Sequence, residues 1–202
     1  MEIKSKLKVE SGKLKAVKPQ VRLLKEMKKV VFDKDFAEKN PDLELYYMYR
    51  GIKKKDSLRY DITVVPPKML GKEFVRTKGN QNSENFQELY NVLSGKAIFL
   101  VQKAVKNIVE DVFFVKAKKG EWVKIPPKYA VVMINPQKKT LKTANWISNE
   151  NENIYKELEK MKGACYFFTK SGWIKNKNYK KIPSLYRKFP LKNKPKNLDF
   201  LK

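Results

Sequence analysis

Between residues 43 and 134 the chain is a series of short runs rich in β-branched and aromatic residues, separated at close intervals by Gly, Pro, Asn or Lys turns. Runs of this kind are typical of an antiparallel sandwich or barrel. We therefore predict an all-β domain. The expected strands are Leu43–Arg50, Leu58–Val65, Glu73–Thr77, Glu88–Leu93, Ala97–Lys103, Ile108–Ala117, Trp122–Ile125 and Tyr129–Ile134.

Helical spacing is confined to a few short segments. Gln20–Val30 carries apolar residues at helical intervals, and Glu152–Lys162 does so with Gly163 at its end. We expect a hairpin over 164–176 and find no internal repeat. The predicted organisation is one domain over 1–174, made of N-terminal strands and a helix (1–42), a barrel core (43–147) and a C-terminal helix and hairpin (148–174). A basic extension (175–202) follows it.

The residue inventory excludes several kinds of chemistry. The chain has no His, which removes Ser–His and Cys–His catalysis and every His-containing metal site. Its one Cys, Cys165, cannot form an internal disulfide and fits a reducing compartment. No apolar run approaches the length of a membrane span, and the N-terminus lacks the apolar core of a signal peptide. We expect a cytoplasmic protein with no membrane association.

Positive charge is the strongest feature of the composition. Lys and Arg number 46 against 21 Asp and Glu, giving a net charge of +25. An ion-pair surface would need matching acids, so the excess favours a polyanion partner, with RNA first. Only five of the cations are Arg. That scarcity favours contact with phosphates over base-specific recognition.

Residues 175–202 hold nine Lys, one Arg and a single acid, with three Pro and four aromatic residues between them. The segment is either a solvated tail or an extended arm that follows phosphates and stacks its rings on bases. A second basic cluster reads as a hairpin loop beginning at Arg50. The expected nucleic-acid contacts are Arg50, Lys53, Lys54, Lys55, Arg59, Lys180, Lys181, Tyr186, Arg187 and Lys188.

The spacing between residues 80 and 135 carries a family resemblance. Asn80-x-Asn82, Glu88 and Gly95, followed by Gly120, Pro126, Val131 and Asn135, follow the order of the two cupin motifs. Leu70-Gly71-Lys72-Glu73-Phe74, Thr77-Lys78-Gly79, Glu88-Leu89-Tyr90 and Ile125-Pro126-Pro127 resemble the cupin-type glucose-6-phosphate isomerases of archaea. The likeness runs from about residue 7 to about residue 183. It implies a cupin (double-stranded β-helix or jelly-roll) barrel with a few short peripheral helices, and a homodimer.

In that family two His and a Glu of the first motif and a His of the second hold a divalent metal. The corresponding residues here are Asn80, Asn82, Glu88 and Val131. Neutral amides are weak ligands for a transition metal and Val131 offers no donor atom, so we expect no metal site and no cofactor. Lys128 stands where the second motif has a Gly, and Asn153 where the family has a further active-site His.

The resemblance also implies a sugar-phosphate pocket. It assigns phosphate contacts to Thr77, Lys78 and Gly79, and it matches Tyr90 and Tyr155 to tyrosines that line the pocket. Two interpretations of function follow. The first is a non-catalytic cupin acting as a basic RNA-binding module, associated with the ribosome. The second is a sugar-phosphate isomerase, with Glu88 as its base, or a sugar-phosphate sensor.

Overall fold

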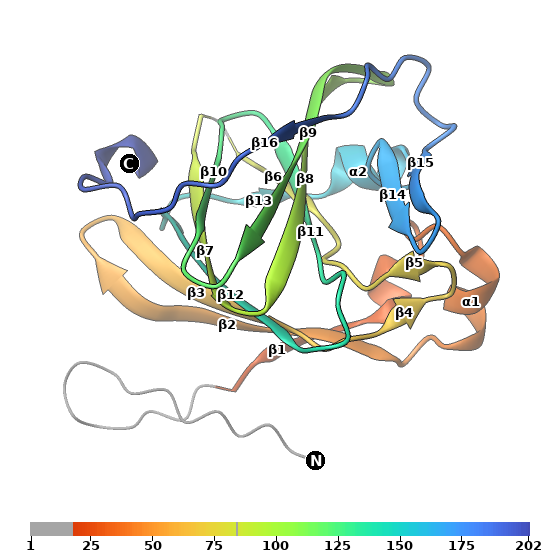
Figure 1. The fold of residues 1–202 in the computed structure, drawn as a ribbon, viewed down its shortest axis with the longest axis horizontal. Helices are drawn as coiled ribbons and strands as arrows, with labels where there is room; N and C mark the ends of the chain where they lie inside the picture. Colours follow the sequence, from red (N-terminus) through yellow and green to blue (C-terminus); the bar gives the residue numbers. More distant parts are fainter. Residues whose placement is uncertain (1–17, 84) are drawn as a thin grey trace.

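The computed structural model describes residues 18–83 and 85–202, so the strands expected within 1–17 lie outside the described part (Figure 1). One six-stranded sheet has the order β1 (Gln20–Leu23), β2 (Glu44–Lys55), β3 (Leu58–Val65), β12 (Leu141–Ser148), β7 (Glu88–Ser94), β10 (Trp122–Ile125). A second has the order β13 (Asn153–Ile154), β6 (Asn80–Asn82), β11 (Ala130–Ile134), β8 (Lys96–Val105), β9 (Ile108–Lys118), β16 (Tyr186–Lys188).

A smaller sheet and short helices lie beside the barrel. The four-stranded sheet has the order β15 (Gly172–Lys175), β14 (Tyr166–Thr169), β5 (Glu73–Phe74), β4 (Met69–Leu70). The helices are α1 (Lys34–Lys39), α2 (Lys156–Lys160) and two single 3₁₀ turns, Leu24–Met27 and Asp199–Leu201. None of the helices in the described ranges is long and apolar enough to cross a membrane.

The main core lies between the inner faces of the two six-stranded sheets. Alternate residues of each strand point inward, so Tyr46 and Met48 of β2 face the same core as Phe99 and Val101 of β8. The rings of Tyr90 and Phe99 join the two sheets with their centroids 5.0 Å apart. Closure of the sheets around this core gives the predicted barrel.

The predicted helix over Gln20–Val30 was wrong in its first half. Gln20–Leu23 forms β1, which pairs antiparallel with β2, and only Leu24–Met27 is helical. Pairing with β2 satisfies the backbone of these four residues, so the tertiary partner overrides the local helical spacing. The helix predicted over Glu152–Lys162 starts later, at Lys156, because Asn153 and Ile154 pair with β6.

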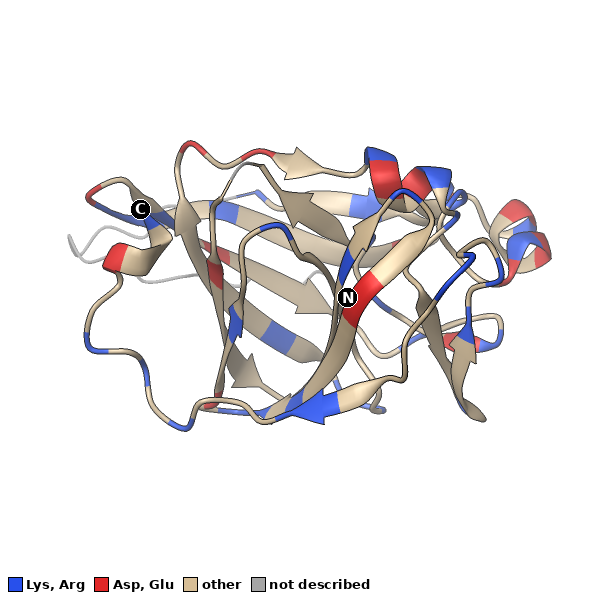
Figure 2. Cartoon of the chain, turned by 90° about the horizontal axis from the view of Figure 1, so that it is seen from above, with Lys and Arg blue, Asp and Glu red and all other residues tan. Residues whose placement is uncertain are grey.

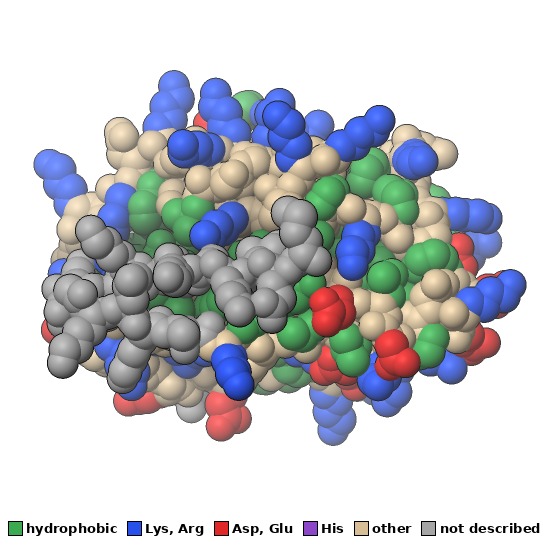
Figure 3. Space-filling view, turned by 90° about the horizontal axis from the view of Figure 1, so that it is seen from below, with side chains coloured by type: hydrophobic (Ala, Val, Ile, Leu, Met, Phe, Trp, Pro, Cys, Tyr) green, Lys and Arg blue, Asp and Glu red, His purple; other side chains and the backbone are tan. Residues whose placement is uncertain are grey.

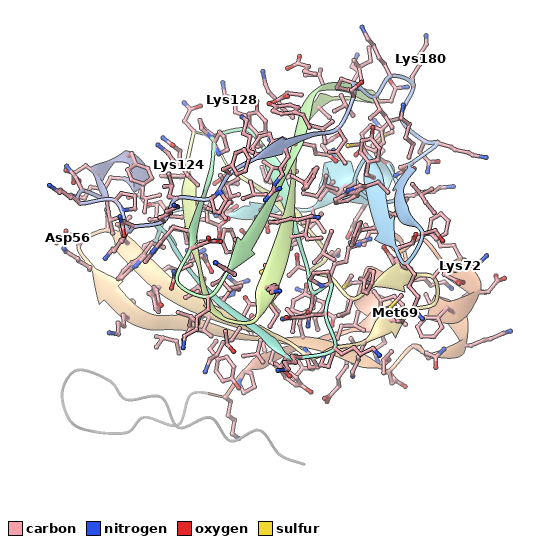
Figure 4. All side chains as sticks on the ribbon, viewed as in Figure 1. Asp56, Met69, Lys72, Lys124, Lys128 and Lys180 are labelled. Carbon is pink, nitrogen blue, oxygen red and sulfur yellow. The ribbon has the colours of Figure 1, made fainter. Side chains whose placement is uncertain are left out.

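The loop predicted to begin at Arg50 is also a strand. β2 continues to Lys55, and the hairpin turn lies at Asp56 and Ser57, at the tip labelled in Figure 4. The register of β2 against β3 shifts between Tyr49 and Lys53. Gly51 lies in this irregularity with φ +62°, a conformation that glycine adopts without steric cost. The glycine therefore marks a β-bulge and not a turn.

Residues 175–202 are extended, but they lie along the barrel (Figure 1). β16 pairs in parallel with β9, placing Tyr186 opposite Phe113. Tyr179 is buried, and its hydroxyl donates to the carbonyl of Gly163 and accepts from the amide of Gln102. Leu201 is 0% exposed in a cluster with Leu58, Leu89 and Trp146. The segment thus contributes to the core and covers the edge of β9.

Candidate functional site

A polar pocket of about 40 Å³ lies inside the barrel. Its lining comes from both main sheets and from the segments beside β6 and β13. Along β2 the lining residues are Tyr46, Met48 and Arg50, which share one face of the strand because side chains alternate. The other lining residues are Thr63, Thr77, Lys78, Gly79, Asn80, Glu88, Tyr90, Met133, Asn145, Asn153 and Tyr155.

Glu88 is the acidic residue that lines this pocket. It is 4% exposed, and its Oε1 accepts a hydrogen bond from Asn145 Nδ2 at 2.6 Å. Its Oε2 is buried and has no hydrogen-bond partner among the described residues. Burial raises the pKa of Glu88 to about 7, while interactions with the Tyr90 hydroxyl and with Arg50 act in the opposite direction. The site therefore holds a carboxyl group that can exchange a proton near neutral pH.

Two arginines expected to contact nucleic acid lie beside this carboxyl group. Arg50 Nη1 donates to Asp61 Oδ2 at 2.8 Å, and Arg59 Nε donates to the same oxygen at 3.2 Å. Asp61 is buried, and its other oxygen accepts from the backbone N–H of Gly51. Arg59 also donates to the carbonyl of Ser148. These contacts fix the wall of the pocket behind Glu88.

The segment expected to hold phosphate enters the same pocket. Lys78 Nζ forms an ion pair with Glu159 of α2 at 2.5 Å and lies 4.9 Å from the centre of the Tyr155 ring. Thr77 Oγ1 accepts from the backbone N–H of Met133 and keeps its own proton to donate. The backbone N–H of Lys78 donates to the hydroxyl of Tyr46.

Gly79 allows close packing of the chain against the side chains of Val132 and Leu158. A Cβ at this position would lie 2.6 Å from the side chain of Val132 and 2.9 Å from that of Leu158, and the residue has φ +83°. A side chain here would separate α2 from β11. The glycine thus lets the segment 77–79 pass between these two elements.

Arg76 holds the segment 77–79 in place through hydrogen bonds to its backbone. Its guanidinium donates to the carbonyls of Thr77, Lys78 and Val30, and its Nε pairs with Glu73 Oε2 at 3.1 Å. Both members of the ion pair are almost fully buried. The remaining Glu73 oxygen accepts from the backbone N–H of Phe32. The position of Lys78 is therefore set by a hydrogen-bonded, buried charge pair.

The residues at the family's metal positions do not fit a metal. Asn80 Nδ2 donates to the side-chain oxygens of both Asn82 and Asn153, so these amides are already hydrogen-bonded to one another. Val131 is buried in the apolar core, on the strand that pairs with β6. Within the ranges that the structure describes, no three His, Cys, Asp or Glu residues gather into a metal-binding group. One carboxylate among neutral amides is a poor ligand set for a divalent transition metal.

The other predicted nucleic-acid contacts lie outside the pocket, in two places. Lys54 and Lys55 are exposed on β2 near the tip of the hairpin, next to Lys53. The second group lies along the C-terminal segment, where Lys180 projects from the upper part of the molecule in Figure 4. Exposed members of this group are Lys180, Lys181, Tyr186, Arg187 and Lys188.

The sequence prediction missed several lining residues of the pocket. Tyr46 and Met48 were assigned to a strand without a role, and Arg50 was assigned to nucleic acid. The alternation Tyr46, Met48, Arg50 along β2 is the signal that would have placed them together. Asn145 of β12 is a further lining residue that was missed, and its side chain donates a hydrogen bond to Glu88.

A barrel of two mainly antiparallel sheets closed around a polar interior pocket defines this protein as a cupin. Solved structures with similarity include the oxalate decarboxylase of Lactobacillus farciminis in complex with formate, with 13% identity over 59% of this chain and 34% of that chain, TM-score 0.46. The cupin domain of Cnp3 from Schizosaccharomyces pombe has 13% identity over 59% of this chain and 72% of that chain, TM-score 0.38.

The chain belongs to the glucose-6-phosphate isomerase family, whose model, described as Glucose-6-phosphate isomerase (GPI), matches residues 23–184. The glucose-6-phosphate isomerase of Thermococcus litoralis is 30% identical over 136 residues, which are 64% of this chain and 70% of the relative. That of Pyrococcus furiosus is 29% identical over 136 residues, again 64% and 70% of the two chains. The resemblance and fold predicted from the sequence are confirmed.

Proposed function

We propose that this cupin binds a sugar phosphate in the barrel pocket and isomerises it between aldose and ketose, with Glu88 as the group that moves the proton and without a resident metal. The observation that carries the proposal is the buried, unpartnered Oε2 of Glu88 in a pocket that also contains Lys78. Membership of the glucose-6-phosphate isomerase family supports the choice of substrate. We prefer this proposal to the non-catalytic interpretation of the sequence, because the family match favours a sugar-phosphate isomerase and Glu88 lines the pocket with a buried carboxyl group.

The chemistry needs one group that accepts a proton from carbon and returns it. The Glu88 carboxylate takes the proton from C2 of the open-chain aldose, and the electrons of that C–H bond form the C1–C2 double bond as O1 takes a proton from a water molecule, which leaves hydroxide. Glu88 then gives its proton to C1 as the hydroxide takes the proton from O2, which produces the ketose and restores the water. A carboxyl group with a pKa near the working pH is suited to both halves of this transfer.

Entry of the substrate requires a rearrangement at α2. A volume of about 40 Å³ holds one or a few water molecules, far less than a hexose phosphate needs. Lys78 is held by Glu159, and the Tyr155 ring lies beside its ammonium group. A phosphate that replaces the Glu159 carboxylate as the partner of Lys78 would preserve the charge pair and open this side of the pocket.

The test measures conversion of glucose 6-phosphate to fructose 6-phosphate with a metal chelator present throughout. We expect turnover in the wild type that increases with pH through an apparent pKa near 7, because the base must be deprotonated. Glu88→Gln should lower kcat by roughly 100-fold or more. Glu157→Gln, an exposed glutamate on α2, is the matched control and should change nothing.

Two results would contradict the proposal. The first is binding of the sugar phosphate with no turnover in the wild type, which would support a sensor. The second is an absence of turnover with the chelator present, followed by turnover when a divalent metal is added in excess of the chelator. Either result would leave the family assignment intact and remove the metal-free proton transfer.

A further inference from the structure

A cleft of about 670 Å³ lies on the outside of the barrel, away from the polar pocket. It is bounded by the β8–β9 hairpin, the β14–β15 hairpin and the C-terminal segment around Arg187 to Lys192. Its floor is largely apolar and includes Ile98 and the stacked rings of Phe74 and Phe168, 5.4 Å apart. Its volume lies in the range of pockets that bind ligands of small-molecule size.

The rim of this cleft carries unpaired positive charge. Lys96 and Lys118 lie opposite each other at the end of the β8–β9 hairpin. The full set of rim cations is Lys96, Lys116, Lys118, Lys170, Arg187 and Lys192, against the one acid Glu121. No ion pair joins any of the six to an acid in the residues that the structure covers, whereas Lys25, Lys78 and Lys103 elsewhere on the molecule are paired.

A largely exposed aromatic ring, that of Phe189, lies on the same rim. Phe189 is 76% exposed, and the guanidinium of Arg187 lies 4.8 Å from its ring centre. Such a ring offers a face for stacking beside a cation that can contact phosphate. The combination of a cationic rim, an apolar floor and an uncovered ring points to a ligand that is both anionic and flat.

The positive charge continues beyond the cleft in one direction. Lys and Arg recur along the trace of the C-terminal segment from β16 toward the chain end in Figure 2. Lys192 and Lys194 follow Phe189, and Lys194 lies 5.6 Å from the ring of Trp146. On the part of the face in Figure 3 that is not drawn in grey, hydrophobic side chains are exposed among the cations. A ligand longer than the cleft that follows the C-terminal segment would therefore meet further cations.

We propose that this cleft and the C-terminal segment bind single-stranded RNA, with the phosphates on the rim cations and a base stacked on Phe189. Five of the six rim cations are Lys, which contacts phosphates as a point charge. The exposed ring of Phe189 favours RNA over an acidic peptide, because a base can stack on it and a run of carboxylate side chains cannot. Single-stranded RNA also exposes the bases that the ring requires, which duplexes do not.

The test uses the full chain and a fluorescent 12-residue oligouridine, with affinity measured between 50 and 200 mM salt. If all six rim cations contact phosphates, affinity should fall by roughly 300-fold over this range. A variant with Lys96→Gln, Lys118→Gln and Lys170→Gln should bind more weakly and lower the slope of log affinity against log salt by about two. The matched control, with Lys54→Gln, Lys156→Gln and Lys160→Gln, has the same net charge and should keep the wild-type slope.

Further measurements distinguish RNA from other polyanions and distinguish binding in the outer cleft from binding in the barrel pocket. Phe189→Ala should lower the affinity for oligouridine by roughly 5- to 150-fold, which is the contribution expected of a single stacked base. Polyglutamate of equal charge should compete poorly. Equal losses in the two triple variants, or competition by polyglutamate with no effect of Phe189→Ala, would overturn the proposal. Saturating glucose 6-phosphate and the Glu88→Gln substitution should leave RNA affinity unchanged, so failure at one site is distinguishable from failure at the other.

Discussion

Replacing Glu88 by Gln should make the protein more stable above neutral pH. The carboxyl group is buried, and burial raises its pKa from the ordinary 4.5 to about 7. In the folded state the group therefore binds a proton more tightly than in the unfolded chain. Between these two values the native state holds more protons, so the free energy of unfolding falls as pH rises. The stability that the protonated carboxyl contributes is fully present near pH 4.5 and is lost once the pH exceeds about 7.

The size of the stability change follows from the difference in the pKa of Glu88 between the folded and unfolded states. A pKa difference of roughly 2.5 at 1.36 kcal/mol per pH unit lowers the free energy of unfolding by about 3 kcal/mol between pH 4.5 and 7. The charged groups facing Glu88 are Arg50, Arg59 and Asp61, with Tyr90 as the neighbouring phenol. The chain has no His, the residue that would otherwise dominate titration between pH 5 and 8. A change in the free energy of unfolding between pH 5 and 8 can therefore be assigned to Glu88 more directly than in a protein that contains His.

The assay is urea unfolding of the wild type and of Glu88→Gln at half-unit steps from pH 4.5 to 8.5. Gln keeps the shape of the side chain and can still accept from Asn145, so the variant should fold. We expect the two curves to meet near pH 4.5 and to separate by about 3 kcal/mol at pH 8, with the variant more stable. Parallel curves across the whole range would refute the argument that burial raises the pKa of Glu88. Glu157→Gln controls for the loss of an exposed charge.

Four other substitutions or treatments probe the fold. Leu201→Ala should lower the free energy of unfolding by about 2–5 kcal/mol in urea titrations, because it empties a fully buried position; a change below 0.5 kcal/mol would mean the segment is only loosely attached. Lys128 has φ +65°, so Lys128→Gly should stabilise by up to about 1 kcal/mol, measured as an increase in Tm, and a decrease would contradict the strain. Arg76→Met should cost about 3–5 kcal/mol by leaving Glu73 buried and unpaired, with near-neutral behaviour as the contrary result. Cys165, buried and with its pKa raised to about 12, should resist a thiol reagent in the native state and react within minutes in urea.

The barrel was predictable because its strands alternate and its turns carry glycine. Local pattern alone indicated β8, β9 and the turn at Gly120, which has φ +89°. The first helix was misread because Val21, Leu24 and Met27 satisfy a helical spacing, whereas Val21 and its neighbours in Gln20–Leu23 pair with β2, a contact that the local sequence does not show. Long-range pairing decides such segments.

The candidate site was also predictable only in part, because some of its contacts depend on long-range packing. The resemblance placed Thr77, Lys78, Gly79, Tyr90 and Tyr155 in one pocket, and all five line it in the structure. It did not indicate that Glu159 holds Lys78, since the two residues meet only after α2 has packed against the barrel. Composition likewise showed the cationic excess without its distribution. The unpaired rim of the outer cleft exists because three separate segments converge there.

The parallel pairing of β16 with β9 has a consequence for synthesis of the chain. Phe113 leaves the ribosome roughly 70 residues before its partner Tyr186, which at 5–20 residues per second is a delay of about 4–15 s. During that interval β9, with its Val-Phe-Phe-Val run, presents an open hydrogen-bonding edge. Lys116 and Lys118, which follow that run, are exposed charges of the kind that keep a nascent strand from pairing with another chain. We infer that these two lysines protect the edge of β9 until β16 has been synthesised and pairs with it.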